Sequence, residues 1–167
     1  MKDLILNSAA SYAGKNKKRN KKPASADLKR IQHTEILNGC TEYLHFLEDF
    51  KQEVLPNKTR TIRLLGKKTS AQIIHTLLGY EVQASYKRIQ CPDLVTARYI
   101  RLFSELGFHS IPLPYDPTLT ARLIPKFESA IDSLVRHIRE RFPENPSLQN
   151  YVIRKVFAII RTQVSSR

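Results

Sequence analysis

The chain has 167 residues, of which 41 % are apolar, and 28 lysines and arginines stand against 15 acids, a formal net charge of +13. This length is enough for one domain with its own core, and only 5 glycines argue against a β-rich fold with many tight turns. So large an excess of positive charge goes beyond what solubility needs and costs self-repulsion unless a partner neutralises it. The composition therefore favours an anionic partner, with nucleic acid ahead of acidic proteins and anionic membranes.

The cysteines and the first residues indicate a protein that is not exported. Cys40 and Cys91 lie far apart, and two cysteines are too few for a disulfide framework, so we expect free thiols in a reducing compartment. The apolar run at Leu4–Leu6 is shorter than the roughly 7–15 residues of a signal peptide. No stretch approaches the roughly 18 apolar residues of a membrane span. A cytoplasmic protein is predicted, and binding to a membrane is not favoured.

Residues 1–25 are predicted to form a flexible basic arm, followed by a single helical domain over residues 26–167. The arm offers no apolar side chains to bury around its cations, which favours disorder in isolation. Flexible cations can follow a phosphate chain and release its counterions. The predicted nucleic-acid contacts of the arm are Lys15, Lys17, Lys18, Arg19, Lys21 and Lys22.

An acidic helix is predicted from Asp27 to Leu55, with Ser25 or Asp27 as its cap and Pro56 at its end. Apolar side chains recur along it at helical spacing. The acids of this helix outnumber its single lysine from residue 31 onward; they are Glu35, Glu42, Glu48, Asp49 and Glu53. The positive charge is therefore divided into blocks rather than spread evenly.

A second basic block covers residues 58–68, with no acid inside it. Ile62, Leu64 and Leu65 alternate with its cations, which indicates a short strand or turn beside the core. Contact with phosphates competes here with a simpler interpretation, a strand edge that is protected by charge. The candidate binding residues of this block are Lys58, Arg60, Arg63, Lys67 and Lys68.

The segment 69–89 is predicted to form two short helices. In the first, Ile73, Ile74, Leu77 and Leu78 share a face and Gly79 ends the helix. A second would cover residues 81–89. The arrangement is superficially like a helix-turn-helix, but His75, Ser85 and Arg88 stand where small or apolar residues are expected, so the pattern favours two helices of a bundle.

Three further helices are predicted in the second half of the chain. The first begins at Pro92-Asp93 and ends at Gly107, and its Arg98 and Arg101 are candidate phosphate contacts beside Tyr99. A proline-rich connector, 108–117, leads to a helix that starts at Asp116-Pro117 and ends at Phe142-Pro143, with a kink or break at Pro125. Asn145-Pro146 starts the last helix.

No pattern of residues supports catalysis, a metal or a cofactor. The five histidines, His33, His45, His75, His109 and His137, are widely separated, and none forms an i, i+4 pair with another histidine or a cysteine. Gly66-Lys67-Lys68-Thr69 lacks the first glycine and the residue order of a phosphate-binding loop. The sequence therefore predicts no enzyme and no cofactor.

The sequence as a whole predicts an all-α fold, a compact bundle of about five helices behind a basic arm. The predicted function is a non-enzymatic nucleic-acid-binding module within a nucleoprotein complex, gripping the backbone of RNA or DNA. The alternative is a helical adaptor subunit that binds acidic proteins in an assembly. The choice between RNA and DNA stays open, because it depends on contacts to the 2′-hydroxyl in a folded site.

Overall fold

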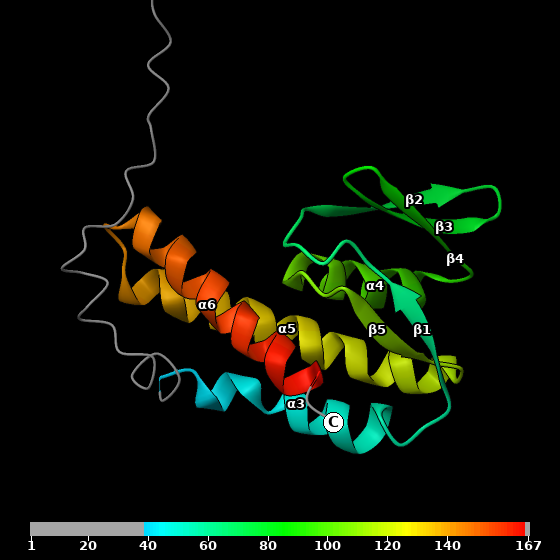
Figure 1. The fold of residues 1–167 in the computed structure, drawn as a ribbon, viewed down its shortest axis with the longest axis horizontal. Helices are drawn as coiled ribbons and strands as arrows, with labels where there is room; N and C mark the ends of the chain where they lie inside the picture. The colour runs from blue at the N-terminus through cyan, green and yellow to red at the C-terminus, as the bar shows by residue number, and fades with distance from the viewer. Residues whose placement is uncertain (1–38, 166–167) are drawn as a thin grey trace, which may run out of the picture.

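The computed structural model describes residues 39–165, and these form a mixed α/β fold (Figure 1). The predicted all-α bundle is therefore wrong, because five strands in two antiparallel sheets lie between and beside the helices of this part of the chain. The basic arm and the predicted start of the first helix lie outside the described residues.

The described part begins with helical segments that end at the predicted place. A 3-10 turn, η1 (Thr41–Leu44), leads into α3 (Phe46–Asp49) and the π-helical η2 (Phe50–Val54). The buried side chains of the last two segments are Phe46, Leu47, Phe50 and Val54. Leu55 and then Pro56 follow, and proline has no backbone N–H with which to continue the helical hydrogen bonds.

The first sheet pairs β1 (Thr59–Arg63) with β5 (Ser110–Pro114) in antiparallel register, with Ile62 opposite Ile111. The short strand predicted within 58–68 is confirmed. The interpretation of 108–117 as a connector is wrong, because β5 lies within it. Pro112 and Pro114 argued against a strand here, because proline has no N–H to donate to a neighbouring strand. The strand forms nevertheless, because β5 pairs with β1 alone among the described strands and leaves its other edge without a partner strand.

The second sheet is a meander of β2 (Ala71–Thr76), β3 (Gly79–Ala84) and β4 (Lys87–Cys91). The prediction of two short helices over 69–89 is therefore wrong, and the likeness to a helix-turn-helix falls with it. Side chains alternate between the two faces: Ile73 pairs with Val82 and Val82 with Ile89, one row on the face toward the core. Short apolar runs fit both helical and strand periods, and the β-branched residues here decide for strand.

The two turns of the meander explain why the sequence was misread. Gly79 has a φ of +115° and starts β3 after a tight turn, where a helix C-cap was expected. The turn between β3 and β4 is formed by Ser85 and Tyr86, with Ser85 at a φ of +57°. A turn without glycine or asparagine at its left-handed position carries no clear hairpin signal.

Helix α4 (Leu94–Leu106) follows the meander and starts and ends where the sequence predicts. The Asp93 carboxylate accepts a 2.7 Å hydrogen bond from the Thr96 backbone N–H, which satisfies one of the first amides of the helix. Gly107 ends it at a φ of +82°. A Cβ at this position would lie 2.7 Å from the Lys68 backbone nitrogen, so the close approach of two loops also requires glycine.

Helices α5 (Pro117–Arg141) and α6 (Pro146–Ser165) complete the described fold and confirm two predicted helices. Asp116 caps α5, and the Asn145 side chain accepts a 3.0 Å hydrogen bond from the Leu148 backbone N–H at the start of α6. Helix α5 continues through Pro125, so the prediction of a break at this proline is wrong.

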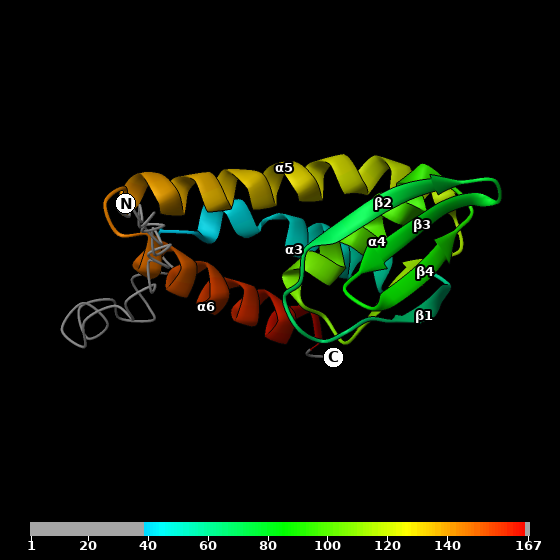
Figure 2. The ribbon, with the colours of Figure 1, turned by 90° about the horizontal axis from the view of Figure 1, so that it is seen from above.

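The core is centred on aromatic rings contributed by four segments. Phe103 of α4 lies within 4.7–5.6 Å of Tyr99, Phe108 and Phe50, measured between ring centroids, and Phe127 of α5 lies 6.5 Å away. Seen from above, the meander lies over α4, with α5 and α6 extending to the left (Figure 2). Helix α4 therefore has the meander on one side and the other helices on the other.

Matched leucine substitutions test this assignment of the core. Leu134 of α5 is 0 % exposed, whereas Leu78 at the β2–β3 turn is 84 % exposed. We expect L134A to lower the free energy of unfolding by about 2–5 kcal/mol, because it leaves a cavity, and L78A to change it by less than about 0.5 kcal/mol. Urea denaturation followed by circular dichroism measures both, and equal losses would contradict the described core.

Candidate nucleic-acid interface

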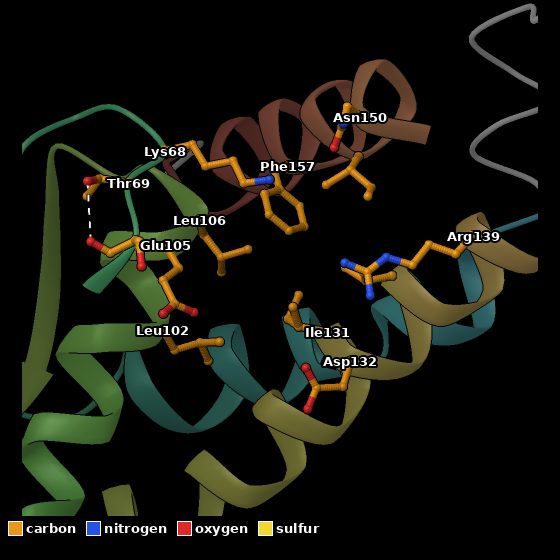
Figure 3. Close-up of a pocket in the computed structure, with 13 residues that line it drawn as sticks. Lys68, Thr69, Leu102, Glu105, Leu106, Ile131, Asp132, Arg139, Asn150 and Phe157 are labelled. Carbon is orange, nitrogen blue, oxygen red and sulfur yellow. Dashed lines mark hydrogen bonds between the residues drawn. The ribbon is translucent and has the colours of Figure 1, made fainter. Parts of the chain in front are cut away.

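A pocket of about 450 Å³ lies between the β1–β2 loop and helices α4, α5 and α6 (Figure 3). Its apolar lining includes Leu102 and Leu106 of α4, Ile131 of α5 and Phe157 of α6. These elements meet because each turns an apolar face to the shared core. Charged side chains from the loop, α4 and α5 then surround the apolar floor.

Three cations from three different elements form a group at this pocket, which we call the cationic cluster: Lys68, Arg139 and Arg154. All three residues are exposed, and Lys68 and Arg139 line the pocket. Burial lowers the pKa of Lys68, and the positive charges of Arg154 and Arg139 lower it further, against a smaller opposing effect of Glu105. Within residues 39–165, none of the three forms an ion pair. The repulsion inside the cluster is thus only weakly compensated.

Lys68 also contacts an aromatic ring of the pocket. Its Nζ lies 5.2 Å from the centroid of Phe157, a distance at which the face of the ring attracts a cation. Figure 3 shows the Lys68 side chain extended along Phe157 and the Arg139 guanidinium reaching toward the centre of the pocket. Both charges therefore face the pocket.

Acidic side chains occupy the other side of the pocket. Glu105 and Asp132 line it from α4 and α5. Burial raises the pKa of the Glu105 carboxyl, while the positive charge of Arg101 and a hydrogen bond with the Ala71 backbone counteract part of this effect. The pocket is consequently positive along the loop and the end of α5, and acidic toward α4.

The predicted basic block 58–68 is exposed but divided by the fold. Lys58 precedes β1 and lies 5.5 Å from the Tyr115 ring, and Arg60 lines a second hollow of about 220 Å³ together with Asp93. Arg63 ends β1, and Lys67 and Lys68 lie in the following loop. The structure therefore joins Lys68 to arginines of α5 and α6 rather than to Lys58 and Arg60.

Arg98 and Arg101, the remaining predicted contacts, both bind Glu128 of α5. The Arg98 guanidinium donates to both carboxylate oxygens, and Arg101 Nη2 donates at 3.0 Å. The Glu128 side chain is 15 % exposed, and this hydrogen bonding raises the pKa of Arg98. These two arginines tie α4 to α5, so any phosphate contact would compete with Glu128.

Two members of the cationic cluster, Arg139 and Arg154, were not among the predicted binding residues. Each is a single cation on the outer face of an amphipathic helix, and such a side chain usually faces solvent without binding a ligand. Only the pairing of α5 with α6 across the short connector 142–145 brings them near Lys68. The sequence offered no local signal for this cluster. The arm residues Lys15–Lys22 lie outside the described residues.

Searches for other kinds of site and for relatives identify none. Among the described residues, no group of three or more histidines, cysteines and acids is placed to hold a metal ion. No helix within residues 39–165 has the length and hydropathy to cross a membrane. The chain matches no protein family, no curated protein and no solved structure.

Glu105, which lines the pocket, should make the free energy of unfolding depend on pH. Because its pKa is raised in the folded protein, the folded state holds the proton more tightly than the unfolded state, and ionisation on raising the pH destabilises the fold. We expect the free energy of unfolding of E105Q, relative to the wild type, to rise between about pH 4 and pH 7. Urea denaturation across this range measures the difference, and a difference that falls with pH would contradict the assignment.

Proposed function

We propose that this chain is a non-enzymatic nucleic-acid-binding module that grips the phosphate backbone. The observation that carries the proposal is the cationic cluster: Lys68 and Arg139 line one pocket, Arg139 and Arg154 each repel Lys68, and none of the three forms an ion pair among the described residues. A phosphate chain between them would replace repulsion with attraction and release its own counterions. A gain of this kind does not depend on base sequence.

The distribution of ion pairs supports the same function. Several arginines and lysines of the helical layer have acidic partners: Arg122 binds Glu53, and Lys126 Nζ lies 3.8 Å from Asp49. Two acids of the segment 41–54, Asp49 and Glu53, are thus engaged by α5. Exposed cations of the β1–β2 loop have no such partner among the described residues, which leaves them available to a ligand.

The proposed module also includes the arm. Six of its residues between Lys15 and Lys22 are cationic, and a segment of this composition adds phosphate contacts without fixing a base sequence. Such an arm and a folded cationic cluster together suit a subunit of a nucleoprotein complex. The cluster would set the position of the backbone, and the arm would add affinity.

A second candidate function, an adaptor within a protein assembly, is favoured by one feature of the meander. Leu77 and Leu78 are 105 % and 84 % exposed at the β2–β3 turn, and Tyr86 is 81 % exposed at the next turn. Exposed apolar side chains of this size are typical of protein contacts. A partner complex that survives nuclease treatment, with no nucleic acid on the free protein, would favour the adaptor over the nucleic-acid-binding module.

Neutralising the cationic cluster tests the proposed function. We expect R139Q and K68Q each to weaken binding to a generic duplex and to single-stranded RNA alike, and to reduce the salt slope of the binding constant by about 1. The physical reason is the loss of one phosphate contact per substitution. Fluorescence anisotropy across a series of salt concentrations measures both quantities on the full chain.

Two matched substitutions on α5 serve as controls. Arg122 and Lys126 are exposed cations of the same helix, but both have acidic partners. R122Q and K126Q are expected to keep the wild-type salt slope. Equal effects of the cluster and the control substitutions would show a diffuse charge effect and would contradict a localised cluster, and absence of any binding would overturn the function itself.

A further inference from the structure

The meander presents one polar face that the described elements leave uncovered. Helix α4 covers the opposite face, where Val82, Ala84 and Cys91 are at most 2 % exposed. Figure 2 looks onto the uncovered face, with α4 behind it. Alternation along the strands places these residues on the uncovered face: Gln72, Ile74, Glu81, Gln83, Arg88 and Gln90.

The register arranges these side chains in two rows across the three strands. Gln72 pairs with Gln83, which pairs with Arg88, and Ile74 pairs with Glu81, which pairs with Gln90. Neighbouring strands are about 4.8 Å apart, so the three backbones span roughly 10 Å. The major groove of B-form DNA is about 12 Å wide and admits a two-stranded β-ribbon, which β3 and β4 provide.

We infer that this face reads base edges in the major groove of double-stranded DNA. The inference rests on the proposed function and names its partner. Glutamine amides pair with the N6 and N7 edge of adenine, arginine pairs with the O6 and N7 edge of guanine, and glutamate accepts from the N4 amine of cytosine. All three side-chain types occur on this face, and strands hold them on a rigid surface backed by α4.

The composition of the face distinguishes duplex DNA from RNA. Sheets that bind single-stranded RNA stack bases on aromatic side chains, but no aromatic residue lies on this face, since Tyr80 belongs to the covered face and contacts His75 there. The major groove of A-form RNA is too deep and narrow for side chains to read. Hydrogen-bonding side chains without stacking rings therefore fit the open major groove of B-form DNA.

The cations near the sheet lie at one of its ends. Ala71 pairs with Ala84, and Ala84 with Lys87, so the end that holds the β3–β4 turn adjoins the loop of Lys67 and Lys68. Phosphates that flank the groove would meet the exposed Lys67 while the glutamines face the bases, and Lys68 keeps its place in the pocket. Glu81 lies near the middle of the face, where base edges rather than phosphates would approach. Its carboxylate lies 3.7 Å from the exposed Arg88 guanidinium, so a guanine contact of Arg88 would replace this ion pair.

Selection from a random duplex library tests the inference on the full chain. The wild type is expected to enrich a short sequence motif, and Q83A and R88A are expected to lose roughly fivefold to a hundredfold of the preference at one position each. Binding to a non-selected duplex should change much less, because most of that affinity comes from phosphates. Thermal unfolding of each variant shows that the fold is retained.

Matched controls are Q52A and R136A, which remove exposed side chains of the same types from helical segments outside the meander. They should retain the wild-type motif in full. Binding without an enriched motif, a motif unchanged in Q83A and R88A, or a preference for single-stranded RNA would each overturn the reading of DNA by the sheet and leave backbone binding intact. Failure to bind any nucleic acid would overturn both.

Discussion

Helix α4 is buried on two sides, and the placement of both sheets and of α5 depends on this. Its Ala97, Tyr99, Ile100 and Phe103 are at most 1 % exposed. The meander contacts one side of the helix and α5 the other. Tyr99 also donates a 2.8 Å hydrogen bond to the Pro112 carbonyl, which fixes β5, and through it β1, to the same helix. Burial of the Tyr99 hydroxyl raises its pKa, so the group stays a donor.

The end of α4 positions the loop that carries the lysines of the proposed interface. Leu64 and Gly66 donate backbone hydrogen bonds of 2.7 and 2.9 Å to His109 and Phe108, directly after the helix. Arg161 of α6 donates a 2.6 Å hydrogen bond to the Leu106 carbonyl at the same place. The loop and α6 are thus held against one helix terminus, which is why Lys68 and the arginines of the cationic cluster face one another.

Residues with strong local signals made the helices predictable. Asp93 and Gly107 mark the ends of α4, and Asp116-Pro117 and Asn145-Pro146 mark the starts of α5 and α6, because capping depends on near neighbours in sequence. The meander was missed because Ile73, Ile74, Leu77 and Leu78 fit a helical face, and its second turn lacks glycine. Pairing with β3 decides the outcome there, and pairing is not local.

In the candidate site, too, some features could be predicted from the sequence and others depend on the fold. The exposed cations of 58–68 could be predicted from the absence of acids around them. Their grouping could not, because Arg139 and Arg154 reach Lys68 only after α5 and α6 have packed together. Arg98 and Arg101 carry the charge that phosphate contacts need. Both nevertheless bind Glu128, which lies about thirty residues further along the sequence. Charge in a sequence identifies candidates, and tertiary partners decide which of them stay available.

The β1–β2 loop and the uncovered face of the meander are together the proposed surface for nucleic acid. NMR titration of the full chain with a short DNA duplex tests it directly, by mapping which backbone amides shift. We expect shifts over residues 66–72, along β3 and β4, and around Arg139 and Arg154, with the first half of α5 unaffected. Shifts confined to the first half of α5 and the segment 41–54, or no shifts at all, would contradict it.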